Sequence, residues 1–176
     1  MPCEEMAMNL PSLPDISGRF KFKDGNRSGY FFKEASGYLG TPGDVATHRD
    51  INEQRAVSAG TGEHAVHLIG IQFGAPGDLR NLGLQNPNTN TFAPKPLQEA
   101  FQGSGGNYLK LEAAWSELLK LGYKIHVTVT DKYRANENRP YTRSVQWTEH
   151  PPHGEATQRS VEFVNFTSPQ SRAQEH

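Results

Sequence analysis

The spacing of apolar residues changes its period between residues 107 and 133, and this change restricts the fold more than any other feature of the sequence. From Asn107 the apolar side chains recur at helical spacing on one face: Tyr108, Leu111, Trp115, Leu118 and Leu119. Gly122 then provides the helix stop. The next ten residues, KIHVTVTDKY, alternate apolar and polar side chains, which is the period of a strand. The sequence therefore predicts one long helix followed directly by a β-strand.

Other stretches predict further strands with loops between them. GRFKF and YFFKE predict the arms of a β-hairpin joined by the turn DGNRSG (24–29), with Asp24-Gly25 as the turn signal. AVHLIGIQFG (65–74) predicts a strand, and GAPGDLRNLG predicts a turn that leads into a short extended piece. SVQWTEH and RSVEFVNF predict two more strands, joined by HPPHGEA. Residues 37–62 predict a short helix or an ordered loop, and PLQEAFQ predicts one helical turn. This order predicts an α+β domain with antiparallel strands.

The length of 176 residues suits a single domain with a substantial core. We expect a flexible N-terminal tail over residues 1–17, where three prolines interrupt any periodicity, a domain over 18–166, and a C-terminal tail over 167–176. One cysteine excludes a disulfide within the chain. The formal net charge of −1 means that bulk charge does not indicate a nucleic-acid binder, so any basic surface must be local.

The sequence gives no sign of a membrane protein or of a classical secretion signal. No apolar run approaches the roughly 18 residues that a bilayer-spanning helix needs. The first residues carry acidic side chains where a signal peptide carries positive charge. We therefore expect no membrane partner, and a protein that leaves its cell by another route or belongs to a longer chain.

Two groups of residues suggest metal binding, each with a simpler reading beside it. The segment NLGLQNPNTN (81–90) is rich in Asn and Gln, which favour turns, although an Asn carbonyl oxygen also suits Mg²⁺ as a single protein ligand. The histidine pairs His64/His67 and His150/His153 suggest zinc, but the sequence has no CxxC or HExxH motif and no third ligand at a recognised spacing.

Charged residues near the helix and the following strands allow similar alternatives. Glu112 and Glu117 belong by default to the solvated face of the helix, whereas a glutamate packed over the strand of His67 would be placed to hold water on a metal. The arginines at 134, 139 and 143 predict a solvated hairpin tip, with a local phosphate-contacting patch as the alternative.

Taken together, HLIGIQFG, NL followed by Q, the last Asn of QNPNTN, and YLKLEAAW resemble the DNA/RNA non-specific endonucleases of the ββα-metal (His-Me finger) type. They resemble most the small versions found as toxin domains of bacterial secreted effectors. The resemblance extends through KIHVTVTDKYRANENRPYTRSVQW and covers roughly residues 49 to 150. It implies a ββα-metal finger core with an antiparallel sheet and one long helix.

The resemblance assigns roles to four residues. His67 matches the general base, and Asn90 matches the metal-binding Asn at the end of the Q-x-x-x-x-N run. Glu112 matches the helix glutamate that orients water on the metal, and is counted as both a catalytic and a metal residue. Asn81 matches the structural Asn of the NL pair.

The chain departs from the family just before the proposed base. Many members read Asp-Arg-Gly-His, whereas this chain reads His64-Ala65-Val66-His67. His64 is thus expected to support the site, and the phosphate-contacting Arg is missing at position 65. Three other arginines are candidates for that contact: Arg49, Arg55 and Arg134.

The resemblance implies a metal-dependent endonuclease that hydrolyses phosphodiester bonds of DNA, RNA or both without sequence preference, using Mg²⁺ or Mn²⁺. It further implies an antibacterial toxin, delivered by a specialised secretion system and inhibited by a cognate immunity protein. The alternative is a catalytically silent nucleic-acid- or protein-binding module on the same scaffold, which the missing arginine at Ala65 favours and the retention of His67, Asn90 and Glu112 disfavours.

Overall fold

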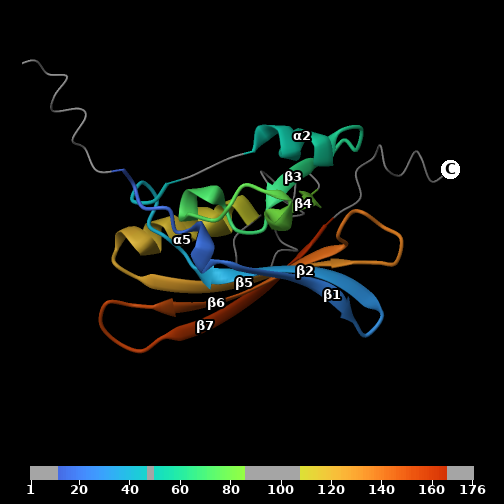
Figure 1. Cartoon of the computed structure of the whole chain (residues 1–176). Coiled ribbons are helices and arrows are strands. Elements are labelled where there is room, and N and C mark those ends of the chain that lie inside the picture. Colours follow the sequence, from blue (N-terminus) through green and yellow to red (C-terminus); the bar gives the residue numbers. More distant parts are fainter. Residues whose placement is uncertain (1–11, 47–49, 86–107, 166–176) are drawn as a thin grey trace, which may run out of the picture.

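A five-stranded antiparallel sheet forms the centre of the computed structural model, which describes residues 12–46, 50–85 and 108–165 (Figure 1). The strand order is β1-β2-β5-β6-β7. The strands are β1 (Lys21–Arg27), β2 (Tyr30–Tyr38), β5 (Lys124–Tyr133), β6 (Thr142–His150) and β7 (Thr157–Val164). Every neighbouring pair is antiparallel, which confirms the α+β class.

Alternation along β5 separates the two faces of this sheet. Ile125, Val127 and Val129 are fully buried, whereas the residues between them are partly exposed. The strand occupies the ten residues that the sequence predicts. Strands β6 and β7 also match their predictions within two residues at each end. The predictions are confirmed here because a period of two is a property of the strand backbone itself.

The first hairpin forms as predicted, and its turn lies at the end of the predicted stretch DGNRSG (24–29) and not at its Asp24-Gly25 signal. Asp24 and Gly25 lie inside β1 and pair with Lys33 and Phe32. The turn is the two-residue pair Ser28-Gly29, with φ of 45° and 87°. Two positive φ values match the twist of a tight hairpin, so the later Ser-Gly pair closes the turn.

Helix α5 (Tyr108–Lys120) packs on one face of the sheet through its aromatic residues. The ring of Tyr108 lies edge-on to Phe163 of β7 at 5.8 Å, and Trp115 lies edge-on to Trp147 of β6 at 5.7 Å between ring centroids. Gly122, at φ of 90°, follows the helix as predicted. Residues 37–62, left open as helix or loop, contain the short helix α2 (Ile51–Ser58), which the Asp50 side chain caps by accepting from the Glu53 N–H.

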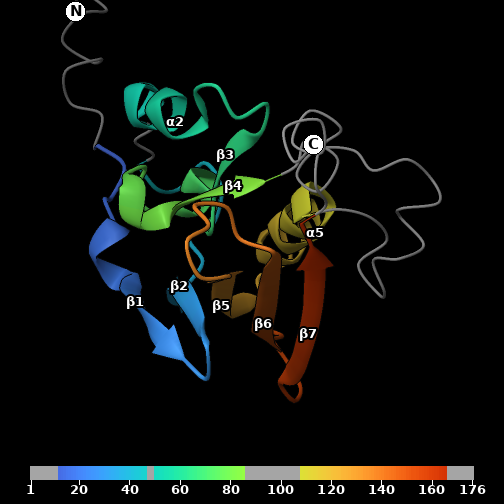
Figure 2. The ribbon, with the colours of Figure 1, turned by 90° about the vertical axis from the view of Figure 1, so that its right-hand side faces the viewer.

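A two-stranded sheet of β3 (His64–His67) and β4 (Leu82–Gln85) lies beside α5 on the same side of the main sheet (Figure 2). The prediction of one strand over 65–74 was wrong beyond His67. The chain turns after Ile69 and forms a 3-10 turn, η2 (Ile71–Phe73), closed by Gly74 at φ of 92°. A second 3-10 turn, η3 (Leu79–Asn81), leads into β4, the predicted extended piece. The predicted helical turn over 96–102 lies outside the described residues.

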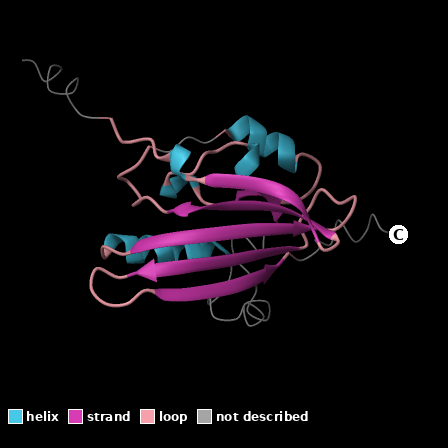
Figure 3. Cartoon of the chain, turned by 60° about the horizontal axis from the view of Figure 1, so that its bottom comes forward, coloured by secondary structure: helices cyan, strands magenta, loops and turns pink. Residues whose placement is uncertain are grey.

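The opposite face of the sheet is open (Figure 3). The core lies between the sheet and the layer of α5 and β3–β4, and it includes Ile16, within the stretch predicted as tail. None of the helices in the described ranges has the length and apolar character that crossing a membrane requires.

Candidate active site

The chain from His67 to Gly70, just after β3, is fixed by partners from three different elements. Asn81, which is fully buried in η3, makes the most contacts with it. Its side chain accepts from the Ile69 N–H at 2.9 Å and donates to the Ile69 and Pro76 carbonyls at 2.7 and 2.8 Å. Its own carbonyl accepts from the Leu68 N–H at 2.8 Å. This geometry replaces strand pairing with side-chain bonds and explains why the extended chain stops at His67.

Asn81→Ala is expected to lower the free energy of unfolding by about 3 kcal/mol, since three buried backbone groups lose their bonds to its side chain. Urea denaturation measures the change. Asn52→Ala on the exposed face of α2 is the control and should change stability by less than about 0.5 kcal/mol. Equal losses in the two variants would show that Asn81 does not hold this turn.

An ion pair buried in the main sheet reaches the backbone of His67. Arg143 of β6 and Asp131 of β5 are both fully buried and bonded twice, at 2.7 and 2.9 Å. The remaining guanidinium nitrogen, Nη1, donates to the His67 carbonyl at 3.1 Å. Burial works against the charged guanidinium, but the adjacent Asp131 carboxylate outweighs it and raises the pKa of Arg143 above its usual value. Arg143 is therefore a permanent cation that holds His67 in place.

The prediction that the arginines at 134, 139 and 143 form a solvated hairpin tip was wrong for two of them. Arg143 is the buried partner of Asp131, and Arg139 pairs with the buried Glu63 at 2.5 Å. Arg139 also donates to the Asn165 carbonyl at 2.9 Å, so it ties the end of β7 to the start of β3. Arg134 stacks over the ring of Tyr141 at 4.7 Å, and nothing in the described structure connects it to His67.

Two further contacts bring the β3–β4 hairpin onto the main sheet and α5. The Tyr108 hydroxyl of α5 donates to the Leu68 carbonyl, next to the carbonyl that Arg143 binds. Lys33 of β2 donates to the carbonyls of Leu79 and Leu82, each at 2.9 Å. Gly83 permits close approach, because a Cβ there would lie 2.2 Å from an Asp131 carboxylate oxygen. The turn at His67 is thereby locked against the sheet.

Glu112, one turn into α5, points to Gly70 at the end of the same segment. The Gly70 N–H donates to its carboxylate, and the Gln72 amide lies 3.5 Å away. A Cβ at Gly70 would lie 2.4 Å from the Glu112 carboxylate, so glycine is required here. Burial raises the pKa of Glu112 to about 7, against the lowering effects of the Arg143 charge and these hydrogen bonds. Glu112 thus lies against the turn that follows the His67 strand, and Glu117 is exposed beside Lys120.

The raised pKa of Glu112 predicts that metal-free protein loses stability as the pH rises from about 4.5 to about 7. In that window the unfolded chain has lost the proton that the folded carboxyl still holds, so ionisation favours unfolding by about 3 kcal/mol in total. Urea denaturation in EDTA across this range should show the fall in wild type. Glu112→Gln should remove it, whereas Glu117→Gln on the exposed side of the helix should retain it. The same dependence of stability on pH in wild type and in Glu112→Gln would refute the raised pKa of Glu112.

The side chain of His67 is buried at the end of β3, and a groove of about 750 Å³ lies on the neighbouring surface between α2 and residues 74–78. Asp78 and Arg55 both line this groove. The pKa of Asp78 is lowered mainly by its hydrogen bonds from Arg80, and also by the charge of His67. The Gln54 amide of α2 donates to the Ala65 carbonyl at 3.0 Å and so docks α2, with Arg55, on β3. Arg55, a predicted phosphate contact, thus lines this groove, and His64, predicted to support the site, is exposed opposite Gln85.

Two predicted site residues, Asn90 and Arg49, lie outside the described residues. Within the described part of the chain, no three His, Cys, Asp or Glu side chains gather closely enough to hold a metal ion. The donors that the prediction assigns to the metal are the Glu112 carboxylate and the Asn90 amide oxygen, and oxygen donors of this kind suit Mg²⁺ or Mn²⁺. A buried carboxyl with a pKa near 7 also fits a cation, because a positive ion would offset the cost of its charge.

Sequence reasoning missed the Asp131–Arg143 pair and Gly70. The signal for the pair was present, since Asp131 continues the inward positions of Ile125, Val127 and Val129 along β5. A charged residue at an inward position requires a buried partner of opposite charge. For Gly70 no sequence signal existed, because its role depends on a carboxylate 42 positions later in the chain.

Two solved structures share this fold. One, titled "extracellular nuclease", has a TM-score of 0.51 at 17% identity over 89% of this chain and 90% of that chain. The other, titled "extracellular endonuclease", has a TM-score of 0.54 at 19% identity over 92% of this chain and 86% of that chain. The architecture is that of the ββα-metal nucleases.

Residues 39–149 match the family model for DNA/RNA non-specific endonuclease. This match spans more than half of the chain, and the chain belongs to the DNA/RNA non-specific endonuclease family. A search of the curated proteins finds no match.

Proposed function

We propose that the protein is an active, divalent-metal-dependent endonuclease that cuts DNA, RNA or both without sequence preference. The observation that carries the proposal is the fixing of His67 and Glu112 by one segment: Arg143 binds the carbonyl of His67, and the Gly70 N–H three residues later binds Glu112. A decayed site would not need both ends of this segment to be held so tightly. The family membership supports the same class of chemistry.

In this proposal the His67 imidazole takes a proton from the attacking water at a ring nitrogen. Glu112 and Asn90 would hold the divalent cation, and Glu112 would orient the attacking water. The cation supplies charge relief at the phosphate and at the leaving oxygen. Asn81, Arg143 and Tyr108 do not contact the substrate but fix the chain that carries His67.

The phosphate contact missing at Ala65 is proposed to come from Arg55. Ala65 is buried in β3, so the side chain of an arginine at this position would start in the interior and would have to extend to the surface to reach a phosphate. Arg55 makes no ion pair with the described residues and lines the groove beside the site. Arg49 and Arg134 remain proposed contributors. A contact limited to the backbone of the substrate is consistent with cutting that ignores base sequence.

Two finer proposals concern biology. The similar solved structures are titled extracellular nucleases, which supports secretion or delivery into a target cell. The resemblance to toxin domains further suggests an antibacterial effector with a cognate immunity protein. A small open reading frame directly downstream, whose product binds and inhibits the nuclease, would support this role.

The test is digestion of supercoiled plasmid and of single-stranded RNA with Mg²⁺ or Mn²⁺, each compared with excess EDTA. We expect cutting that requires the metal and yields no fixed fragment pattern. Wild-type protein that cuts neither substrate with any divalent metal would overturn the proposal and favour the silent binding module.

A further inference from the structure

A groove of about 1070 Å³ lies at the end of the main sheet where β5 begins and β2 and β6 end, the left-hand end in Figure 1. Its walls come from residues 14–21, the end of β2, the connection over 39–45, the last turns of α5 and the start of β5. It is distinct from the groove that holds Arg55 and Asp78, and no residue of the proposed catalytic set lines it.

Positive charge collects in this groove without compensation. Arg19, Lys21 and Lys124 line it, all three are exposed, and none forms an ion pair with a residue that the structure describes. His126 and His150 also line the groove, and Asp44 is the one acidic residue in the lining. A chain with a net charge of −1 therefore concentrates unpaired cations at one end of its sheet.

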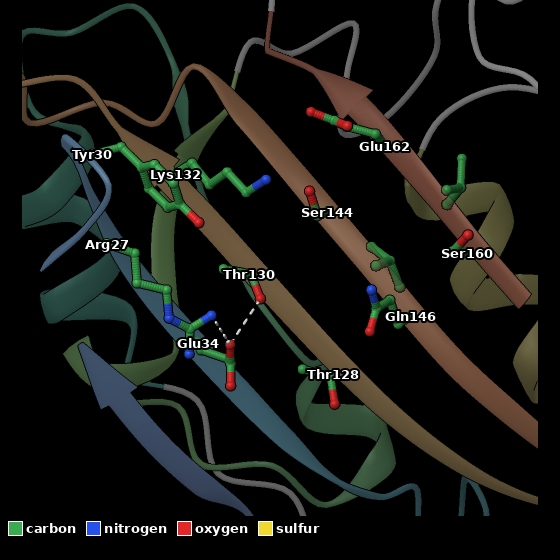
Figure 4. Close-up of a pocket in the computed structure, with 12 residues that line it drawn as sticks. Arg27, Tyr30, Glu34, Thr128, Thr130, Lys132, Ser144, Gln146, Ser160 and Glu162 are labelled. Carbon is green, nitrogen blue, oxygen red and sulfur yellow. Dashed lines mark hydrogen bonds and ion pairs between the residues drawn. The ribbon is translucent and has the colours of Figure 1, made fainter. Parts of the chain in front are cut away.

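On the open face of the sheet, by contrast, basic side chains lie together with carboxylates (Figure 4). There Arg27 and Thr130 both point to Glu34, at 3.9 and 3.1 Å. Glu162 from β7 adds a second carboxylate to the same pocket, which also contains Lys132. Positive charge is balanced on this face, so the excess in the groove is a local property.

Aromatic rings lie beside the unpaired cations. Tyr38, at the end of β2, is 48% exposed. The ring of His126 meets it edge-on at 4.9 Å, and that of His150 lies at 6.1 Å. Tyr123 stands in the wall opposite. Exposed rings next to cations form the kind of surface that holds unstacked bases and their phosphates.

The groove connects structurally to the proposed cleavage site. Its residue Gly40 donates to the Phe73 carbonyl at 2.8 Å, and Phe73 lies three residues beyond Gly70, which binds Glu112. Leu119 lines the groove two turns of α5 after Glu112, a rise of about 10 Å along the helix. A nucleic-acid strand that occupies both the groove and the cleavage site would therefore need only a few nucleotides to span the distance between them.

We propose that this groove binds a single-stranded segment of the nucleic-acid substrate away from the bond that is cut, with Arg19, Lys21 and Lys124 on its phosphates and Tyr38 against a base. The inference rests on the proposed nuclease function and adds to it a means of holding long substrates. It also explains how a near-neutral chain retains its substrate.

Binding is tested with the full-length protein in EDTA, using fluorescence anisotropy of a labelled oligothymidylate. Lys21→Gln/Lys124→Gln should weaken binding about tenfold and reduce the slope of log K against log salt by about 1.4, the value for two lost contacts to a single strand. Lys132→Gln is the control for Lys124→Gln taken alone, because each removes one positive charge from β5 and the two lysines lie about 26 Å apart along the strand. Equal affinities for wild type and the double variant would overturn the proposal.

Tyr38→Ala tests the stacking contact and should weaken oligothymidylate binding at least about fivefold. Binding of a blunt duplex of the same sequence should be weaker than that of the single strand. A duplex that binds more tightly, together with no effect of Tyr38→Ala, would refute the assignment to a single strand.

Cleavage separates this inference from the proposed function. With Mg²⁺, Lys21→Gln/Lys124→Gln should raise KM for long single-stranded DNA about tenfold and leave the cutting of a dinucleotide ester unchanged. An unchanged KM in a protein that cuts well would refute the groove and keep the nuclease. Absence of cutting by wild type would refute the nuclease, while the anisotropy measurement still decides whether the groove binds.

Discussion

Replacing His67 with alanine is expected to lower kcat for plasmid cleavage by about 10² to 10⁴-fold, the usual contribution of a general base. The loss should fall on kcat, with KM nearly unchanged, because His67 is buried and positioned by its carbonyl and not by the substrate. Initial rates of supercoiled plasmid nicking with Mg²⁺, taken over a range of plasmid concentrations, measure both constants.

Two controls belong with this variant. His153→Ala, in the exposed β6–β7 turn, should retain full activity and excludes a general effect of losing a histidine. Added imidazole should restore part of the activity of His67→Ala, since it can enter the vacated space and accept the proton. Undiminished cutting by His67→Ala would remove His67 from the mechanism and leave the fold assignment intact.

Arg143→Met is expected to lower the free energy of unfolding by about 3–5 kcal/mol, because Asp131 would remain as a buried charge without its partner. Urea denaturation measures this loss. Lys120→Ala breaks the exposed pair with Glu117 and should cost less than about 1 kcal/mol. Similar losses in the two variants would show that the buried pair does not stabilise the fold.

A double variant separates the stability of the pair from its action on His67. Asp131→Leu/Arg143→Met removes both charges at once and should recover most of the lost stability, since apolar residues replace buried ion pairs at little cost. Its kcat should nevertheless stay well below that of wild type, because the bond from Arg143 to the His67 carbonyl is lost. Full activity in this stable double variant would show that Arg143 does not position His67.

The elements that were predicted well are those set by local spacing. The alternation of β5 and the apolar face of α5 depend on neighbours within a few residues, and both appear at the predicted positions. The prediction of one strand over residues 65–74 was wrong for a different reason. Its apolar residues suit a strand, but the Asn81 side chain, twelve residues beyond Ile69, takes the hydrogen bonds that would have extended it.

The residues of the candidate site were likewise predicted where a short motif marks them, and were missed or wrong where a distant partner decides their role. His67, Asn81 and Glu112 were identified from short motifs, and the structure brings all three to one turn of chain. The prediction was wrong for Arg139 and Arg143, because the partner of a strand residue such as Arg143 is decided only when β5 and β6 pair. In the paired sheet, Asp131 and Arg143 face each other directly, and both are buried.

The sequence by itself determined the α+β class, the helix and most strands, and the residues that resemble a nuclease site. Those features follow from backbone periods and from residue identities, which need no knowledge of distant contacts. Only the tertiary structure decided that Arg143 holds the His67 carbonyl, that Gly70 leaves room for Glu112, and that unpaired cations gather beside Tyr38. Each of these is an electrostatic or steric relation between residues far apart in the chain, and it exists only once the fold has brought them together.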